Sequence, residues 1–208
     1  MFIAANCDSY NDRESYVKAL MNYTKVESYG KCLHNMNGTT IEGNREELWS
    51  FIAKHKFILA FENSNCEDYI SEKVLNAFRA GVIPVVSGPI DYSTYAPSGQ
   101  SVINVRDFES PKALAAYLEK VGNNQTLYEQ YLTYKNPPSG EGLTDKFKAI
   151  WGDRGPWSVF CEIGERMIDY KTPSKMQAGT ALNPIDMKQC EEPGFMRKMY
   201  VEGTYTTL

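Results

Sequence analysis

The stretch FILAFENSNCEDYISEKVLNAFRAGVIPVV, residues 57–86, decides the fold of this chain. It contains two unbroken apolar runs, 57–61 and 82–86, and such runs are typical of strands that are covered on both faces. Between them, 71–81 places apolar residues at helical spacing and ends at Gly81, a residue that often terminates a helix. A strand, a helix and a second strand in this order predict a parallel pair joined by a crossover helix.

The same alternation continues on both sides of this unit. We predict further strands over 2–5, 26–29 and 101–105, and helices over 12–24, 45–54 and from Ser110 and Pro111 onward. Repeated strand–helix units indicate an α/β fold with a doubly wound, mostly parallel sheet of the Rossmann-like kind.

The character of the sequence changes after residue 135. Residues 136–142 read as a loop and 144–151 as a short helix, and beyond Lys171 no hydrophobic period is visible. We therefore expect a folded domain over 1–170 and an extended or partly ordered tail over 171–208.

Composition argues against several classes of function. Apolar residues make up 42% and charged residues 23%, as in an ordinary globular protein, and the net charge of −4 argues against a nucleic-acid binder. No apolar run reaches the length of about 18 residues that spans a membrane, so no membrane span is expected in this chain. The opening residues, 1–7, read as the start of a strand rather than as a signal peptide.

The five cysteines do not form a metal-binding pattern. There is no CxxC, and the histidines lie far from any cysteine pair, so no structural metal is expected. Cys7 and Cys32 would lie at neighbouring strand ends, where a disulfide and two free thiols are both open possibilities. Cys66 is interpreted as incidental.

Common phosphate-binding motifs are missing from the sequence. There is no GxGxxG, no GxxxxGK[ST] and no Asp-x-Asp pair, so neither a metal ion nor an organic cofactor is expected. Glu72 and Lys73 stand in the first turn of the predicted helix, where a lysine opposes the helix dipole. Either this lysine serves an anionic ligand, most simply a diphosphate, or the two residues are a solvated surface pair.

The segment FENSNCEDYISEK (61–73) resembles the signature of α1,3/α1,4-fucosyltransferases, glycosyltransferase family ten, with Ser71 in place of the usual threonine. NAFRAGVIPVVSGP (76–89), YAPSGQSVINVRDFESPKALAAYL (95–118) and ANCDSYNDRESYVKAL (5–20) resemble the same family. The resemblance extends over about residues 2–170. It implies the C-terminal, GDP-fucose-binding half of an enzyme of the GT-B type.

The resemblance also implies roles for particular residues. Arg13 and Lys73 would bind the diphosphate and, together with Glu72, would act in catalysis by stabilising the transition state and the departing GDP. The full predicted substrate-binding set is Asn6, Arg13, Asn63, Ser64, Tyr69, Glu72 and Lys73. Two cations on the leaving group fit a site that works without a metal ion.

The chain departs from the family in two places. The N-terminal domain that holds the acceptor and supplies the catalytic base is not represented in these 208 residues, and Gly164 replaces the second cysteine of a family pair that begins at Cys161. Three hypotheses result: an inverting α1,3-fucosyltransferase, a GDP-sugar-binding module or pseudoenzyme without turnover, and an unrelated α/β interaction protein. For the first, the expected partners are GDP-fucose and a glycan or glycoprotein acceptor containing GlcNAc, in particular a protein N-glycan. The resemblance implies the Golgi lumen, with the cytoplasm as the alternative.

Overall fold

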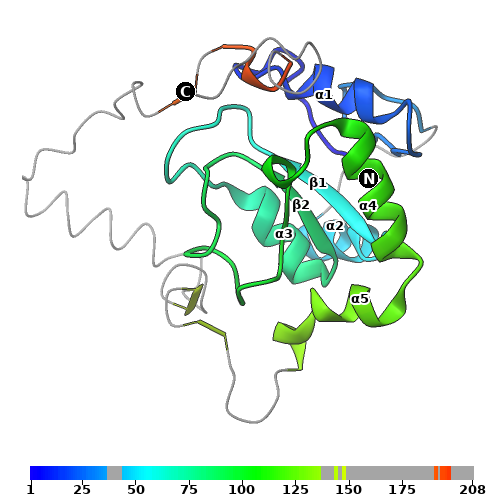
Figure 1. Cartoon of the computed structure of the whole chain (residues 1–208), viewed down its shortest axis with the longest axis vertical. Coiled ribbons are helices and arrows are strands. Elements are labelled where there is room, and N and C mark those ends of the chain that lie inside the picture. The colour runs from blue at the N-terminus through cyan, green and yellow to red at the C-terminus, as the bar shows by residue number, and fades with distance from the viewer. Residues whose placement is uncertain (37–43, 137–142, 145–146, 149–189, 192, 198–208) are drawn as a thin grey trace, which may run out of the picture.

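Three parallel strands form the centre of the protein: β1 (Phe57–Phe61), β2 (Ile83–Ser87) and β3 (Ile103–Asn104), in the order β1-β2-β3 (Figure 1). This is a computed structural model, and it describes residues 1–36, 44–136, 143–144, 147–148, 190–191 and 193–197. The apolar run 57–61 forms β1 with the bounds expected from sequence, and 82–86 corresponds to β2 shifted by one residue.

The sheet continues beyond β1 through single bridges. Phe2 pairs in parallel with Leu59 on one side and with Ser28 on the other. Gly30 lies against the backbone of Ala4, where a β-carbon would come 2.1 Å from the carbonyl oxygen, so a larger residue there would have to shift this segment. The chain moves from Phe2 outward to Ser28 and then crosses back to β1. The winding direction of the sheet reverses between Phe2 and β1, which are neighbours in the sheet.

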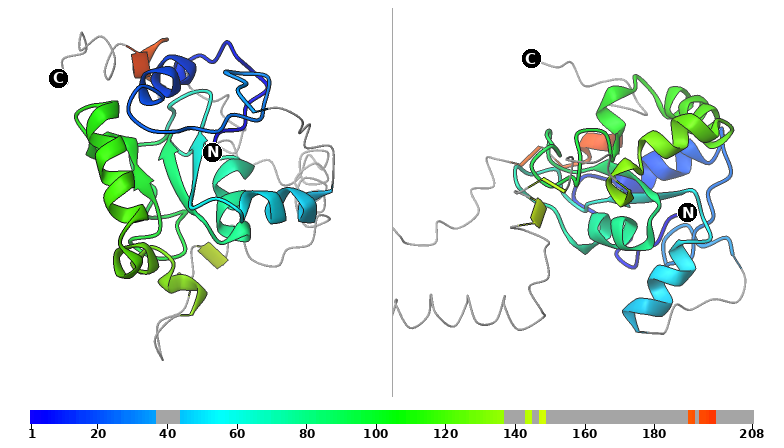
Figure 2. Two further views of the ribbon diagram at one scale, coloured as in Figure 1. Left: turned by 90° about the vertical axis from the view of Figure 1, so that its right-hand side faces the viewer. Right: turned by 90° about the horizontal axis from the view of Figure 1, so that it is seen from below.

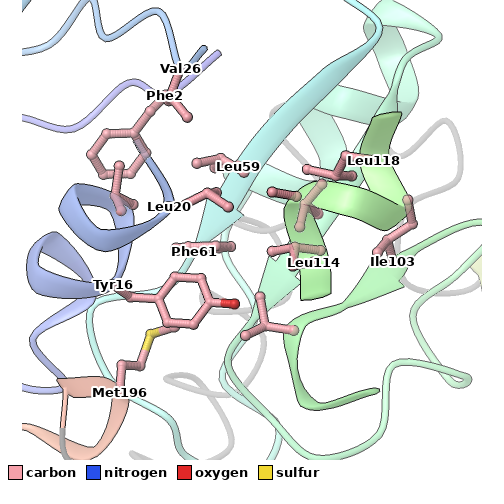
Figure 3. Packing of buried hydrophobic residues seen from close by; sticks show 14 of the residues in the cluster. Phe2, Tyr16, Leu20, Val26, Leu59, Phe61, Ile103, Leu114, Leu118 and Met196 are labelled. Atoms are coloured by element: carbon pink, nitrogen blue, oxygen red, sulfur yellow. The ribbon is translucent and has the colours of Figure 1, made fainter. Parts of the chain in front are cut away.

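Helices cover both faces of the sheet (Figure 2). Side chains of β1 alternate: Leu59 and Phe61 pack with α1 (Arg13–Leu20) and α4 (Pro111–Gly122), as Figure 3 shows. Ile58 and Ala60 face the opposite layer, formed by α2 (Arg45–Ile52) and α3 (Glu72–Ala80). The predicted mostly parallel α/β fold is thus confirmed. The remaining elements are η1 (Val105–Asp107), α5 (Gln125–Gln130) and η2 (Thr133–Lys135).

Local signals set the helix ends. Asp12 caps α1 by accepting a hydrogen bond from the backbone N–H of Ser15, and Ser110 caps α4 by accepting one from Ala113. Gly81 ends α3 with a φ of 70°, in the left-handed region that glycine adopts without strain. No helix in the described ranges is long and apolar enough to cross a membrane.

Two disulfides join distant parts of the chain. Cys7 pairs with Cys32, one of the two possibilities left open by the sequence. Cys66 pairs with Cys190, so the interpretation of Cys66 as incidental is wrong: 124 residues separate the partners, and only the three-dimensional path of the chain brings them together. Cys161, the expected helix beyond residue 148 and the expected domain limit at 170 lie outside the described residues.

The C-terminal residues that the structure describes pack on the domain. Phe195 and Met196 are buried in the same core as Tyr16 and Phe61. The backbone N–H of Met196 donates to the carbonyl oxygen of Asn11, so residues 193–197 lie beside the start of α1 (Figure 1). This part of the expected tail is therefore a component of the folded domain.

Candidate functional site

A cavity of about 390 Å³ opens where the winding of the sheet reverses. Its walls come from the chain after Phe2, from β1 and the loop that follows it, and from α2 and α3. Crevices at this position of open α/β sheets are where ligands bind. The lining residues are Ile3, Ala4, Ala5, Asn6, Arg13, Leu48, Ile52, Ile58, Leu59, Asn63, Glu72, Lys73 and Asn76.

The cavity brings together most of the residues predicted from sequence. Asn6, Arg13, Asn63, Glu72 and Lys73 line it. The remaining two predicted residues, Tyr69 and Ser64, are outside the lining. Tyr69 reaches the site indirectly, since its hydroxyl donates a 2.8 Å hydrogen bond to Asn63 Oδ1, and Ser64 follows Asn63 in the chain as a half-buried residue.

A larger cavity of about 750 Å³ lies at the opposite, amino-terminal edge of the sheet. Its wall includes Glu27, whose pKa is lowered to about 2 by side-chain hydrogen bonds, that from Lys25 foremost. Ligands of open parallel sheets bind outside the carboxyl ends of the strands. The smaller cavity at the carboxyl edge is therefore the candidate site.

Lys73 is held by a buried carboxylate. Its Nζ lies 2.8 Å from Glu62 Oε2 and 2.7 Å from Ser71 Oγ, whereas Glu72 Oε1 is 3.8 Å away. The side chain of Glu62 is fully buried and that of Glu72 is 71% exposed. The ionic partner of Lys73 is thus Glu62 from the end of β1, and Glu72 remains available at the rim of the cavity.

Arg13 connects the two strand ends that border the cavity. Nη1 donates to the carbonyl oxygen of Phe61 at 2.7 Å, Nη2 donates to that of Asn6 at 3.2 Å, and Nε pairs with Glu14 at 3.0 Å. The residue is only 3% exposed. Because a guanidinium has five N–H donors, three such bonds leave donors for an anion in the cavity. Arg13 therefore has a structural role, and its contact with a ligand stays a prediction.

Hydrogen bonds of two further asparagines, Asn11 and Asn65, hold the loop that carries Asn63. Asn11 Nδ2 donates to the carbonyl oxygen of Glu62 and to Asn65 Oδ1, and Asn65 Nδ2 donates to Glu191 Oε2. Arg106 pairs with the same Glu191 oxygen at 2.6 Å. Sequence reasoning missed Asn11 and Asn65, although both stand in the segments that resemble the family.

Charges of both signs meet at this cavity, since Lys73 is paired with Glu62, Arg13 is paired with Glu14, and Glu72 lies in the lining. The two cations of the lining approach it from different elements, and the N-terminus of α3 adds its own positive field. Burial, and then the nearby charge of Glu62, raise the pKa of Tyr92, so this phenol stays protonated. Within the described residues, His, Cys, Asp and Glu side chains form no group of three or more that could hold a metal ion.

Comparisons with known proteins point in one direction. The family model described as "Glycosyltransferase family 10 (fucosyltransferase) C-term" matches residues 1–179. GDP-fucose protein O-fucosyltransferase 3 of Xenopus laevis is 40% identical over 139 residues, which are 64% of this chain and 30% of that protein. The Homo sapiens protein of the same name is 38% identical over 140 residues, covering 65% of this chain and 29% of its own length.

Solved structures show the same fold. A crystal structure of an α1,3-fucosyltransferase with GDP superimposes with a TM-score of 0.58 at 24% identity, covering 70% of this chain and 42% of that one. A second, with GDP-fucose, has a TM-score of 0.57 at 24% identity and covers 72% and 44%. The chain thus spans about 30% of the curated relatives and less than half of these structures.

Proposed function

The chain belongs to glycosyltransferase family 10, the fucosyltransferases, and on that premise we propose that its switch-point cavity binds GDP-fucose for transfer of the fucose. The observation that carries the proposal is the convergence of Lys73 and Arg13 on one cavity at the carboxyl edge of the sheet. The name of the relatives, and the GDP and GDP-fucose that accompany the similar structures, support it.

In the proposed reaction, an acceptor hydroxyl oxygen bonds to C1 of fucose while the bond from C1 to the diphosphate oxygen breaks. The electron pair leaves with GDP, and a base takes the hydroxyl proton. Lys73 and Arg13 stabilise the charge that develops on the departing diphosphate. These two cations supply the neutralisation that a divalent metal ion gives in many glycosyltransferases.

The other predicted residues contact the donor around this diphosphate. Asn63, supported by Tyr69, and Asn6 hydrogen-bond the nucleotide or the sugar. Ser64 lies outside the cavity lining, and we place it at the edge of the donor site only as the neighbour of Asn63. Glu72, exposed at the rim, hydrogen-bonds the fucose or the ribose and stabilises positive charge on the sugar ring in the transition state. Inversion requires the base on the face of fucose opposite the diphosphate. We assign that base to a part of the enzyme outside residues 1–208.

Two acceptors remain within the proposal. The resemblance to α1,3-fucosyltransferases led us to expect a GlcNAc hydroxyl on an N-glycan. The relatives at 37–40% identity carry the name protein O-fucosyltransferase, which favours a hydroxyl on a protein. We adopt the protein acceptor. The two disulfides support an oxidising compartment of the secretory pathway, with the Golgi lumen as the specific expectation.

Titration and turnover test the proposal separately. Isothermal titration of the chain should show binding of GDP-fucose and GDP, with GDP-mannose weaker because its sugar differs. The full-length enzyme, incubated with GDP-fucose and either a folded acceptor protein or an N-glycan, should give a fucosylated protein detected by mass spectrometry. Fucosylated N-glycan alone would overturn the choice of acceptor. Binding without any transfer would support the alternative, a donor-binding module without turnover.

A further inference from the structure

Glu62 is a fully buried carboxylate at the carboxyl end of β1, and the sequence-based prediction gave it no role in donor binding. Burying a carboxylate is expensive unless it is paired and hydrogen-bonded. Here the pairing is complete: Oε1 accepts the backbone N–H of Ser71 at 2.8 Å, and Oε2 lies 2.8 Å from Lys73 Nζ. The hydroxyl of Ser71 lies 2.8 Å from both oxygens.

Both partners of Glu62 belong to the start of α3. The Ser71 N–H is an amide that the helix leaves unpaired, so Glu62 acts as the cap and its charge meets the positive end of the helix dipole. Lys73 gives one N–H to Glu62 and one to Ser71 Oγ. An ammonium has three donors, so the third remains for a ligand in the cavity that Lys73 lines.

The carboxylate itself cannot easily move. The backbone N–H of Glu62 donates to Ser87 of β2 at 2.8 Å, and its carbonyl oxygen accepts from Asn11 at 3.0 Å. Gly88 leaves just enough room beside the side chain, because a β-carbon there would come 3.2 Å from Glu62 Cγ and 2.5 Å from the hydroxyl of Tyr92. Glu62 is thus attached to the sheet, and it fixes Lys73 relative to the sheet.

We propose that Glu62 is a positioning residue for the donor: it holds the Lys73 ammonium and the start of α3 at the cavity so that one N–H of Lys73 reaches the diphosphate. This inference rests on the proposed function. It assigns Glu62 as the residue that orients the Lys73 ammonium, which is the cation proposed to bind the diphosphate. Glu72, which neighbours Lys73 in sequence, is left to contact the sugar or ribose. The positioning requires a negative charge, since a glutamine at this place would turn an N–H group toward the ammonium or break the bond to Ser71.

A double-mutant cycle tests the proposal by titration with GDP. Glu62→Gln alone should weaken GDP binding by about tenfold or more, as expected for a misplaced charge-assisted hydrogen bond. In the Lys73→Ala background the same change should alter GDP affinity by less than about twofold, because the group that Glu62 positions is gone. If Glu62→Gln weakens binding by the same factor in both backgrounds, Glu62 does not act through Lys73, and the inference is overturned.

A replacement variant and a second measurement keep the proposal testable. If Glu62→Gln does not fold, Ser71→Ala replaces it in the cycle, since it removes the hydroxyl that contacts both charged groups. Acetylation of the unliganded protein with acetic anhydride, followed by mass spectrometry, should modify Lys73 slowly in the wild type and faster in the variant, relative to the exposed Lys112. Wild-type protein that fails to bind GDP would contradict the proposed function, whereas unchanged acetylation of Lys73 would contradict the positioning role.

Discussion

At the level of single residues, Arg13 shows how a residue of the proposed site also supports the fold. Its guanidinium joins the carbonyl oxygens of Phe61 and Asn6, the two chain segments that separate at the switch point. Lys73 is similar, because it compensates the buried charge of Glu62. Variants of either residue therefore change stability as well as ligand binding, and the two effects have to be measured separately.

We predict that Arg13→Ala lowers the thermal stability of the unliganded protein. A buried carbonyl oxygen left without a donor costs about 1–3 kcal/mol, and Arg13 bonds the buried one of Phe61 in addition to that of the exposed Asn6. Lys18→Ala, on an exposed position of the same helix, is the control and should leave the melting temperature nearly unchanged. Equal melting temperatures for the two variants, measured by calorimetry, would show that the bonds of Arg13 do not support the fold.

At the level of elements, the described residues of the C-terminal segment, 190–191 and 193–197, hold the loop after β1 in place. The Cys66–Cys190 disulfide and the Asn65–Glu191 hydrogen bonds join these residues to Asn65 and Cys66, and Phe195 anchors them in the core. Since Asn63 on this loop lines the cavity, the segment connects a distant part of the chain to the site.

Removing the Cys66–Cys190 disulfide should destabilise the protein more than removing the Cys7–Cys32 disulfide. In the chain-entropy account, closing 124 residues rather than 25 restricts the unfolded chain more strongly, a difference of about 1.4 kcal/mol. The measurement is the free energy of unfolding in urea for Cys66→Ala/Cys190→Ala and for Cys7→Ala/Cys32→Ala. A larger loss in the second variant would mean that the segment 190–197 does not stabilise the domain as described.

Local signals explain which elements the sequence predicts well. The run 57–61 and the helix that ends at Gly81 have boundaries set by neighbouring residues, and the structure confirms both. The partnership of Glu62 with Lys73 depends on how a strand end faces a helix start, and that of Cys66 with Cys190 on a chain path of more than a hundred residues. Neither leaves a pattern in a single sequence, so the predicted site contained the lysine without the carboxylate that orients it.

At the level of the whole molecule, the winding of the sheet determines where the charges meet. The chain passes from Phe2 to Ser28 on one side and to β1 on the other, which leaves a crevice at the carboxyl edge. The net charge of −4 gives the protein no general attraction for polyanions. The proposed selectivity for a diphosphate therefore comes from the local placement of Lys73 and Arg13 and not from the overall field.

The most direct test of this account compares GDP with guanosine, titrated in excess EDTA. We predict that wild-type protein binds GDP without a divalent metal ion and binds guanosine far more weakly. Lys73→Ala should reduce the preference for GDP by about 1.5–3 kcal/mol, the size of a hydrogen bond to a charged group. Lys112→Ala, at the same position of helix α4, should leave it unchanged. A GDP preference that is unchanged in Lys73→Ala, or that disappears in EDTA, would contradict the claim that Lys73 and Arg13 form the diphosphate site.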